Sequence, residues 1–211
     1  MHPLEIPEIV IKRLPLYLRS LELMANEGHN VTSSQELGGK LGISSTQIRK
    51  DLSYFGEFGK QGTGYDVSFL LDQLRLILQV NQPWKVALVG AGHVGHALLR
   101  FSGFENRGFS VAAVFDKDPH KIGRHIERLR VLDVATLREV LQLQAIHIAI
   151  IAVPAEEAQE VADALVAAGV RAILAYAPLT LSVPAHVRVS YLDPVIGLQS
   201  MTYYLSPEQN A

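Results

Sequence analysis

The segment Lys85–Gly95 reads KVALVGAGHVG and decides the fold of the second part of the chain. It begins as a largely apolar run typical of a buried strand, continues as G-x-G-x-x-G, and a helix follows from His96. A second apolar run, Ser110–Phe115, ends at Asp116, which lies 21 residues after Gly95. Strand, glycine loop, helix, strand and acid, in this order, predict a dinucleotide-binding βαβ unit.

The residue types in this unit suit a dinucleotide. The first glycine allows a tight turn, the second lets the backbone approach the pyrophosphate, and the third lets the helix pack against the strand. Free N–H groups at the start of the helix would bind phosphate. Asp116 would accept from a ribose hydroxyl and repel a 2′-phosphate, so we expect NADH or NAD+ rather than NADP(H). Lys117 is a neighbouring cation that softens this preference.

An α/β pattern continues along the chain. We expect a helix over 133–143, a strand over 146–153, a helix over 155–168, and strands over 171–177 and 187–192. Near-continuous apolar strands predict a parallel, doubly wound sheet buried on both faces, with ligand bound where the strands end. The predicted nucleotide-binding residues are Gly90, Ala91, Gly92, His93, Val94, Gly95, Asp116, Val153, Pro154 and Ala177.

The last predicted helix, Pro194–Leu205, is almost entirely apolar. Such a surface has to be covered, either by its own domain or by a second subunit that receives the helix as a swapped arm. The residues alone leave both arrangements open.

The part of the chain before residue 80 is helical in pattern. Pro15 divides its start into two expected helices, Pro7–Leu14 and Pro15–Asn26. We expect the second helix to be largely buried because it is rich in apolar side chains. These are Leu16, Leu18, Leu21 and Leu23.

Two capping boxes follow. Ser33 with Glu36, and Ser44 with Gln47, have the spacing at which a side chain satisfies a free backbone N–H at a helix start. Two short helices separated by a turn at Gly42 form the pattern of a helix-turn-helix.

The second of these short helices has a polar face that suits DNA. At 100° per residue, Ile48, Leu52 and Phe55 form a buried stripe, with Asp51 beside it. The opposite face carries hydroxyl, amide and cationic groups and no acid, and such groups reach bases and phosphates. An ordinary solvated helix face would show the same periodicity, so the pattern alone leaves both interpretations open.

The glycine-rich segment 56–67 comes next and predicts a two-stranded hairpin, the wing of a winged helix, with Lys60 at its tip. A disordered glycine loop is the alternative, and the flanking Phe58 and Tyr65 favour the hairpin. The residues predicted to contact DNA are Ser45, Thr46, Gln47, Arg49, Lys50, Ser53, Tyr54, Lys60, Gln61 and Gly62.

Composition narrows the function further. The chain has 211 residues, no cysteine and a net charge of −2, which excludes a disulfide framework and thiol chemistry. Residues 40–65 nevertheless carry four bases against two acids, a local positive charge that fits DNA.

The histidines lack metal-ligand spacing, so we expect no metal site. We find no signal peptide and no apolar run of roughly 20 residues, and we expect a cytoplasmic protein without a membrane partner.

The seam between the two patterns lies at Val80–Pro83. We predict an α/β chain with three parts: a winged helix-turn-helix DNA-binding domain (1–80), a Rossmann NAD(H)-binding domain (81–192) and a C-terminal helix (193–211). No catalytic acid or base with a substrate domain is evident, so we expect no enzyme. The alternatives are an NAD-dependent oxidoreductase and a CoA-binding Rossmann protein, each with an accessory DNA-binding-like domain.

Arg49–Tyr65 reads RKDLSYFGEFGKQGTGY and resembles the signature of the Rex family of redox-sensing transcriptional repressors. Ile11–Tyr17 resembles the start of that family, and Ile148–Pro154 and Ala177-Pro178 resemble its later strands. The resemblance implies a winged helix, a Rossmann domain and a C-terminal helix swapped across a homodimer. It also implies operator DNA binding that NADH releases, with NAD+ competing for the same site.

The chain departs from the family pattern at three places. His93-Val94 stands where Asn-Leu is common, Ala175 where Asn is common, and Gln61 where Arg is common at the wing.

If NADH and DNA are coupled, the coupling is reciprocal and needs a physical link. The candidate link is Arg19, a cation on an apolar helix, with Asp193, an acid before the C-terminal helix. Two unrelated surface charges are the alternative.

Overall fold

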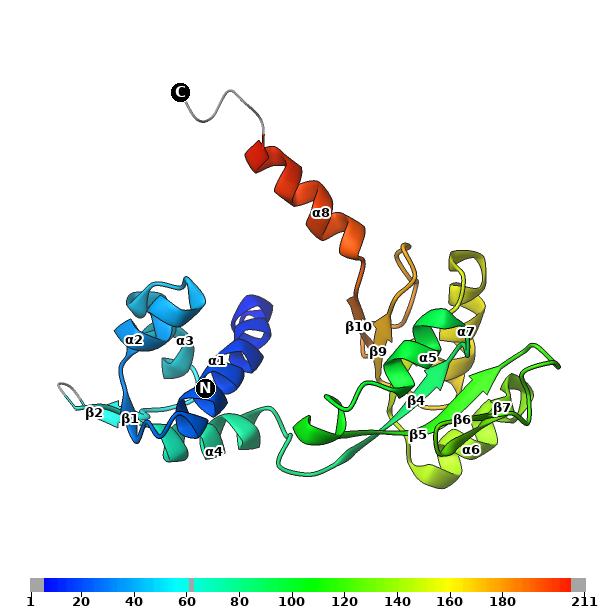
Figure 1. The fold of residues 1–211 in the computed structure, drawn as a ribbon, viewed down its shortest axis with the longest axis horizontal. Helices are drawn as coiled ribbons and strands as arrows, with labels where there is room; N and C mark the ends of the chain where they lie inside the picture. Colours follow the sequence, from blue (N-terminus) through cyan, green and yellow to red (C-terminus); the bar gives the residue numbers. More distant parts are fainter. Residues whose placement is uncertain (1–5, 61–62, 206–211) are drawn as a thin grey trace. The chain divides into compact units, whose positions relative to one another are not determined.

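The computed structural model describes residues 6–60 and 63–205, with the backbone alone at Lys60 (Figure 1). The chain divides into two compact units, Met1–Gln82 and Pro83–Ala211. None of the described helices has the length and apolar character that a membrane span requires.

The first unit is a winged helix-turn-helix. Its elements are α1 (Glu8–Asn26), β1 (Val31–Thr32), α2 (Ser34–Leu41), α3 (Ser45–Ser53), β2 (Gly59–Lys60), β3 (Gly64–Asp66) and α4 (Val67–Ile77). The strands form a small antiparallel sheet in the order β1-β3-β2, so the wing hairpin gains a third strand that the sequence did not predict. Both capping boxes are confirmed, because Ser33 and Ser44 accept hydrogen bonds from the backbone N–H groups of Glu36 and Gln47.

The expected break at Pro15 is wrong, because α1 is one helix with Pro15 inside it. Proline removes the hydrogen bond to the carbonyl four residues back, that of Ile11. Both residues are exposed, so water can replace the missing bond. A continuous buried stripe on the other side of α1 holds the helix together across this point. It consists of Val10, Leu14, Tyr17, Leu21 and Met24.

The core of the first unit lies where α1, α2, α3 and α4 meet. Its fully buried side chains include Leu14, Leu21, Leu37, Ile48, Leu70 and Leu74. The expectation that Leu16 and Leu23 are buried is wrong, since they are 47% and 53% exposed. They lie on the face of α1 opposite the stripe, and helix periodicity places them there.

The second unit is a Rossmann fold. Its sheet is built from β4 (Trp84–Val89), β5 (Phe109–Asp116), β6 (His125–Ile126), β7 (Leu129–Asp133), β8 (Ile148–Ile151), β9 (Ala172–Ala175) and β10 (Arg188–Tyr191). The strand order is β10-β9-β8-β4-β5-β7-β6, in which all pairs are parallel except the edge pair β6–β7. Strands β5 to β7 therefore lie on one side of β4, and β8 to β10 lie on its other side, so the order of strands reverses at β4.

Helices cover both faces of this sheet. On one face, α6 (Leu137–Gln144) and α7 (Ala155–Ala167) pack in a cluster with Ala87 and Val89 of β4. On the other face, α5 (His93–Leu99) packs in a cluster with Val86 and Leu88 of the same strand. Alternate side chains of β4 thus enter two cores, as expected for a doubly wound sheet.

The segment before α6 differs from the expected single helix over 133–143. Residues Leu129–Asp133 form β7, a short turn of 3-10 helix covers Val134–Thr136, and α6 begins at Leu137. Asp133 ends the strand and its carboxylate accepts a hydrogen bond from the N–H of Ala135. A two-residue strand such as β6 leaves too short a pattern to be recognised from sequence.

The chain continues from β10 into α8 (Pro194–Thr202) and a final turn, Tyr203–Leu205. Asp193 is the N-cap of α8, and its carboxylate accepts from the N–H of Val195 at 2.9 Å. No residue of α8 is buried within the chain. Its exposed large apolar side chains, with those of the final turn, are Val195, Ile196, Leu198, Met201, Tyr203, Tyr204 and Leu205.

Candidate functional site

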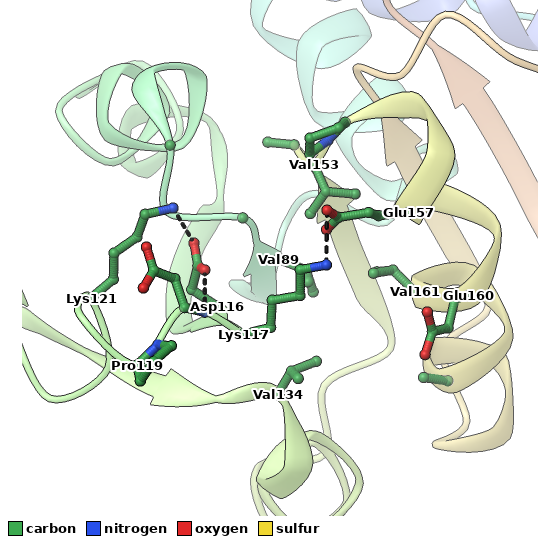
Figure 2. Close-up of a pocket in the computed structure, with 16 residues that line it drawn as sticks. Val89, Asp116, Lys117, Pro119, Lys121, Val134, Val153, Glu157, Glu160 and Val161 are labelled. Atoms are coloured by element: carbon green, nitrogen blue, oxygen red, sulfur yellow. Dashed lines mark hydrogen bonds and ion pairs between the residues drawn. The ribbon is translucent and has the colours of Figure 1, made fainter.

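A cavity of about 630 Å³ opens in the second unit, where β4 and β8 end and the order of strands reverses (Figure 2). In open α/β sheets this is where ligands bind, and the volume suits a small-molecule ligand. The lining residues are Val89, Gly90, Gly92, Asp116, Lys117, Asp118, Pro119, Lys121, Val134, Ala152, Val153, Pro154, Glu157, Glu160, Val161 and Ala164.

The glycine loop, residues 90–95, contributes Gly90 and Gly92 to the lining of this cavity. Gly90 has φ +106°, and a Cβ there would overlap the backbone oxygen of Ala152 on the neighbouring strand connection. At Gly95 a Cβ would overlap the oxygen of Gly90, so only glycine lets α5 pack this close to the loop. Gly92 lines the cavity with open space where its Cβ would be. The three glycines thus fit the turn, the close ligand approach and the helix packing that a dinucleotide loop needs.

Asp116 ends β5 at the wall of the cavity and is 7% exposed. One carboxylate oxygen accepts from the N–H of Ala91 at 2.8 Å and from Lys121 Nζ at 3.0 Å, and the other accepts from the N–H of Asp118 at 2.9 Å. Burial raises the pKa of Asp116, but these hydrogen bonds outweigh it and hold the pKa below its usual value. Asp116 therefore fixes the glycine loop as an anion, a role that the sequence did not predict.

The opposite wall of the cavity comes from α7, which sequence reasoning missed. Glu157, Glu160 and Val161 line it (Figure 2), and so does Ala164 of the same helix. Their spacing of three and four residues places them on one face of a helix that begins after Pro154. That spacing was available in the sequence as a signal.

Charge in the cavity is predominantly negative, with four carboxylates and two lysines in the lining. Both lysines are paired: Lys121 with Asp116, and Lys117 with Glu157 at 2.8 Å. Hydrogen bonding to Glu157 is the main cause that raises the pKa of Lys117. Phosphate groups added to the ribose are disfavoured by such a lining, whereas a ribose diol can donate to it.

Half of the predicted nucleotide-binding residues do not line the cavity. His93 and Val94 are exposed in the first turn of α5, and Ala177 is buried in the sheet core. Ala91 and Gly95 are buried and shape the loop from behind. Those that do line it are Gly90, Gly92, Asp116, Val153 and Pro154.

The first unit holds α3 against α1 through a buried carboxylate. Asp51 is fully buried and accepts from Arg13 Nε at 2.5 Å and Nη2 at 2.8 Å, from Tyr17 Oη at 2.6 Å and from Gln47 Nε2 at 2.7 Å. Burial raises the pKa of Asp51, and the hydrogen bonds from Arg13, Tyr17 and Gln47 outweigh it, so the net pKa is lowered. Burial is also the main cause that raises the pKa of the Tyr17 hydroxyl, followed by its bond to Asp51.

The exposed face of α3 carries Thr46, Arg49, Lys50 and Ser53. Arg49 donates to Ser34 Oγ at 2.9 Å and to Thr46 Oγ1 at 3.1 Å, so its guanidinium is held along the helix surface. Ser53 Oγ donates to the carbonyl of Lys50. This face is a compact set of hydroxyl and cationic groups suited to phosphates and base edges.

Other residues predicted to contact DNA are placed differently. Ser45 and Tyr54 are half-buried at the two ends of α3, and Gln47 already donates its amide to Asp51. The Lys60 side chain, Gln61 and Gly62 lie outside the described residues. Among the residues that are described, no group of His, Asp and Glu could hold a metal ion.

Comparison with curated proteins decides the family. The redox-sensing transcriptional repressor Rex of Chloroflexus aggregans is 55% identical over 203 residues, which are 96% of this chain and 96% of that protein. The chain belongs to the Rex family. A more distant member, from Pelotomaculum thermopropionicum, is 44% identical over 210 residues, covering 100% of this chain and 99% of that one.

Family models and solved structures agree with this Rex membership. A model described as a putative DNA-binding protein N-terminus matches residues 5–53, and one described as a CoA binding domain matches 81–179. A crystal structure of RSP with beta-NAD+ and operator DNA has a TM-score of 0.91 at 36% identity, covering 97% of this chain and 94% of that one. RSP with beta-NADH has a TM-score of 0.88 at 34% identity, covering 97% and 96%.

Proposed function

We propose that this chain is a transcriptional repressor that senses the NADH/NAD+ ratio. It binds operator DNA and releases it when NADH occupies the crevice of the second unit. The observation that carries this function is the pairing, in one Rex-family chain, of a winged helix with a dinucleotide crevice at the switch point of a Rossmann sheet. A Rex-family repressor of the same fold has been solved with operator DNA, with NAD+ and with NADH.

The exposed face of α3 is the proposed DNA reader. Thr46, Arg49, Lys50 and Ser53 enter the major groove, and the wing approaches the backbone beside it. Arg49 and Lys50 supply the cations for phosphate or guanine. The Asp51 network orients this face, because it fixes the rotation of α3 against α1.

The crevice is the proposed NAD(H) site, and its residues fit that ligand better than CoA. The open space at Gly92 admits a pyrophosphate. Asp116 lines the crevice, and its three internal donors leave one of the roughly four acceptor sites of a carboxylate for a ribose hydroxyl. Paired lysines and an excess of acids oppose the 3′-phosphate of CoA. When bound, the nucleotide supplies a redox signal, and this chain supplies its binding and orientation without turning it over.

A homodimer is part of the proposal. The apolar side chains of α8 require a cover, and a second copy that receives α8 as a swapped arm provides one. Arg19 and Asp193 lie on different units, and their link between DNA and nucleotide remains a prediction. Since a repressor works where its operator lies, the proposed location is the cytoplasm.

A gel shift with separate nucleotide titrations tests this function. The full-length protein, on an operator fragment selected from genomic DNA, is expected to bind without nucleotide and to release DNA as NADH rises. NAD+ alone is expected to leave the complex intact and to raise the NADH concentration needed for release. Release by NAD+ alone would contradict the proposal. Lys50→Ala, compared with the exposed control Lys12→Ala, should weaken binding and reduce the salt slope by about 1.

A further inference from the structure

Lys117 occupies a critical position in the crevice. It follows Asp116, the strand-end acid at which a Rossmann site normally binds the ribose 2′-hydroxyl. A cation near that acid is the usual means of accepting a 2′-phosphate, and hence NADP(H). Position alone would therefore assign Lys117 to phosphate binding and make this a site for either nucleotide.

The structure gives Lys117 a different partner. Its side chain reaches across the cavity from the end of β5 to Glu157, in the first turn of α7, with Nζ 2.8 Å from Oε1 (Figure 2). Glu160 and Asp116 also act on Lys117 as nearby negative charges. Lys121, the other lysine of the cavity, is bound to Asp116. Each cation in the lining thus already faces a carboxylate.

We infer that Glu157 is a positioning residue for nucleotide specificity: by pairing with Lys117 it withholds that cation from a 2′-phosphate and so excludes NADP(H). This inference rests on the proposed NAD(H) site. A 2′-phosphate would have to displace Glu157 from Lys117 and leave an uncompensated carboxylate beside its own charge. A ribose hydroxyl makes no such demand, so NADH binding leaves the pair intact.

The test compares NADH and NADPH on the same full-length protein, each followed by its own fluorescence on binding. Glu157→Gln removes the charge while keeping the size of the side chain. The matched control is Glu156→Gln, which makes the same charge change on the same turn of α7, at an exposed position outside the cavity lining. Glu157→Gln should raise the NADPH/NADH affinity ratio by about two- to fivefold, the scale of an exposed ion pair. Glu156→Gln should leave this ratio unchanged.

A double-mutant cycle shows whether Glu157 acts through Lys117. Lys117→Ala alone is the reference with which the double variant is compared. In the double variant with Lys117→Ala and Glu157→Gln, the gain in the NADPH/NADH affinity ratio should disappear, because no cation is left to receive the phosphate. An equal gain with and without Lys117 would overturn the inference, since Glu157 would then act by direct repulsion.

The wild-type titrations separate this inference from the function on which it rests. A wild-type chain that binds no NADH contradicts the proposed function itself. A wild-type chain that binds NADH, with an unchanged NADPH/NADH affinity ratio in Glu157→Gln, contradicts only the inference. Equal wild-type affinity for the two nucleotides also overturns it. If Glu157→Gln misfolds and loses NADH binding, the NADPH/NADH affinity ratio is measured on Glu157→Ala instead.

Discussion

Among the residues that the structure describes, each unit contains one buried carboxylate, and the two have different roles. Asp51 in the first unit is fully buried and is bound by side chains, two of them from α1 and one from its own helix. Asp116 in the second unit keeps 7% exposure and is bound mainly by backbone N–H groups, with one lysine. In both, hydrogen bonds outweigh burial and lower the pKa.

The difference in donors gives the two aspartates different roles, because Asp51 supports the fold and Asp116 also faces a ligand site. Side-chain donors from another helix let Asp51 join two helices, so its effect is on the placement of the DNA-facing surface. Backbone donors let Asp116 set the path of a loop, while its position at the cavity wall keeps it available to a ligand. The role of each buried aspartate therefore depends on whether its hydrogen-bond donors lie on a neighbouring helix or on the ligand-binding loop.

Replacing Asp51 should have the largest effect. Asp51→Ala leaves Arg13 and the buried Tyr17 hydroxyl without their acceptor, and breaking such a buried pair costs about 3–5 kcal/mol. Hydrogen exchange of α1 and α3 should increase sharply and operator binding should be lost. Trp84, the single tryptophan, lies in the second unit, so its fluorescence reports the unfolding of that unit. The urea midpoint of the Trp84 fluorescence transition should therefore stay nearly constant in Asp51→Ala.

The control for Asp51 is Asp72→Ala, an exposed acid on α4 of the same unit. Its effect on stability should stay within about 0.5 kcal/mol. Equal effects of the two substitutions would remove the distinction between a supporting carboxylate and a surface charge.

Replacing Asp116 should have a smaller effect on stability and a specific one on nucleotide. Asp116→Ala leaves the buried N–H of Ala91 unpaired, at a cost of about 1–3 kcal/mol. NADH affinity should fall at least about tenfold, while operator binding without nucleotide persists. Calorimetric NADH titration and gel shift measure the two, with the exposed Asp163→Ala as control. Loss of DNA binding together with NADH binding would contradict the separation of roles.

Lowering the pH should reduce the contribution of both carboxylates to the free energy of unfolding, and this is the smallest expected effect. Each native pKa lies below the unfolded value of about 3.9, so the contribution of each carboxylate is complete above that value. It is lost as pH falls through the native pKa. Urea midpoints should therefore stay level from about pH 7 to 5 and fall below about pH 4. Asp116→Asn should flatten this fall in Trp84 fluorescence, and an unchanged fall would contradict the assignment.

Local features of the fold could be predicted from the sequence because they depend on neighbouring residues. The glycine loop, the acid at the end of β5 and the caps at Ser33 and Ser44 are each decided within a few positions. Prediction failed at Pro15, where packing of the buried stripe outweighs the local preference for a break. It also missed β6, which is too short to leave a periodic signal.

The candidate sites divide in the same way. The sequence by itself determined that a dinucleotide loop and a helix-turn-helix are present. It also placed Thr46, Lys50 and Ser53 on one face of a helix, with Arg49 at its flank. Only the tertiary structure decided that Asp51 is held by Arg13, 38 residues away, and that Glu157 meets Lys117 across the crevice. The reason is physical: periodicity fixes which way a side chain points, whereas its partner depends on which elements pack together.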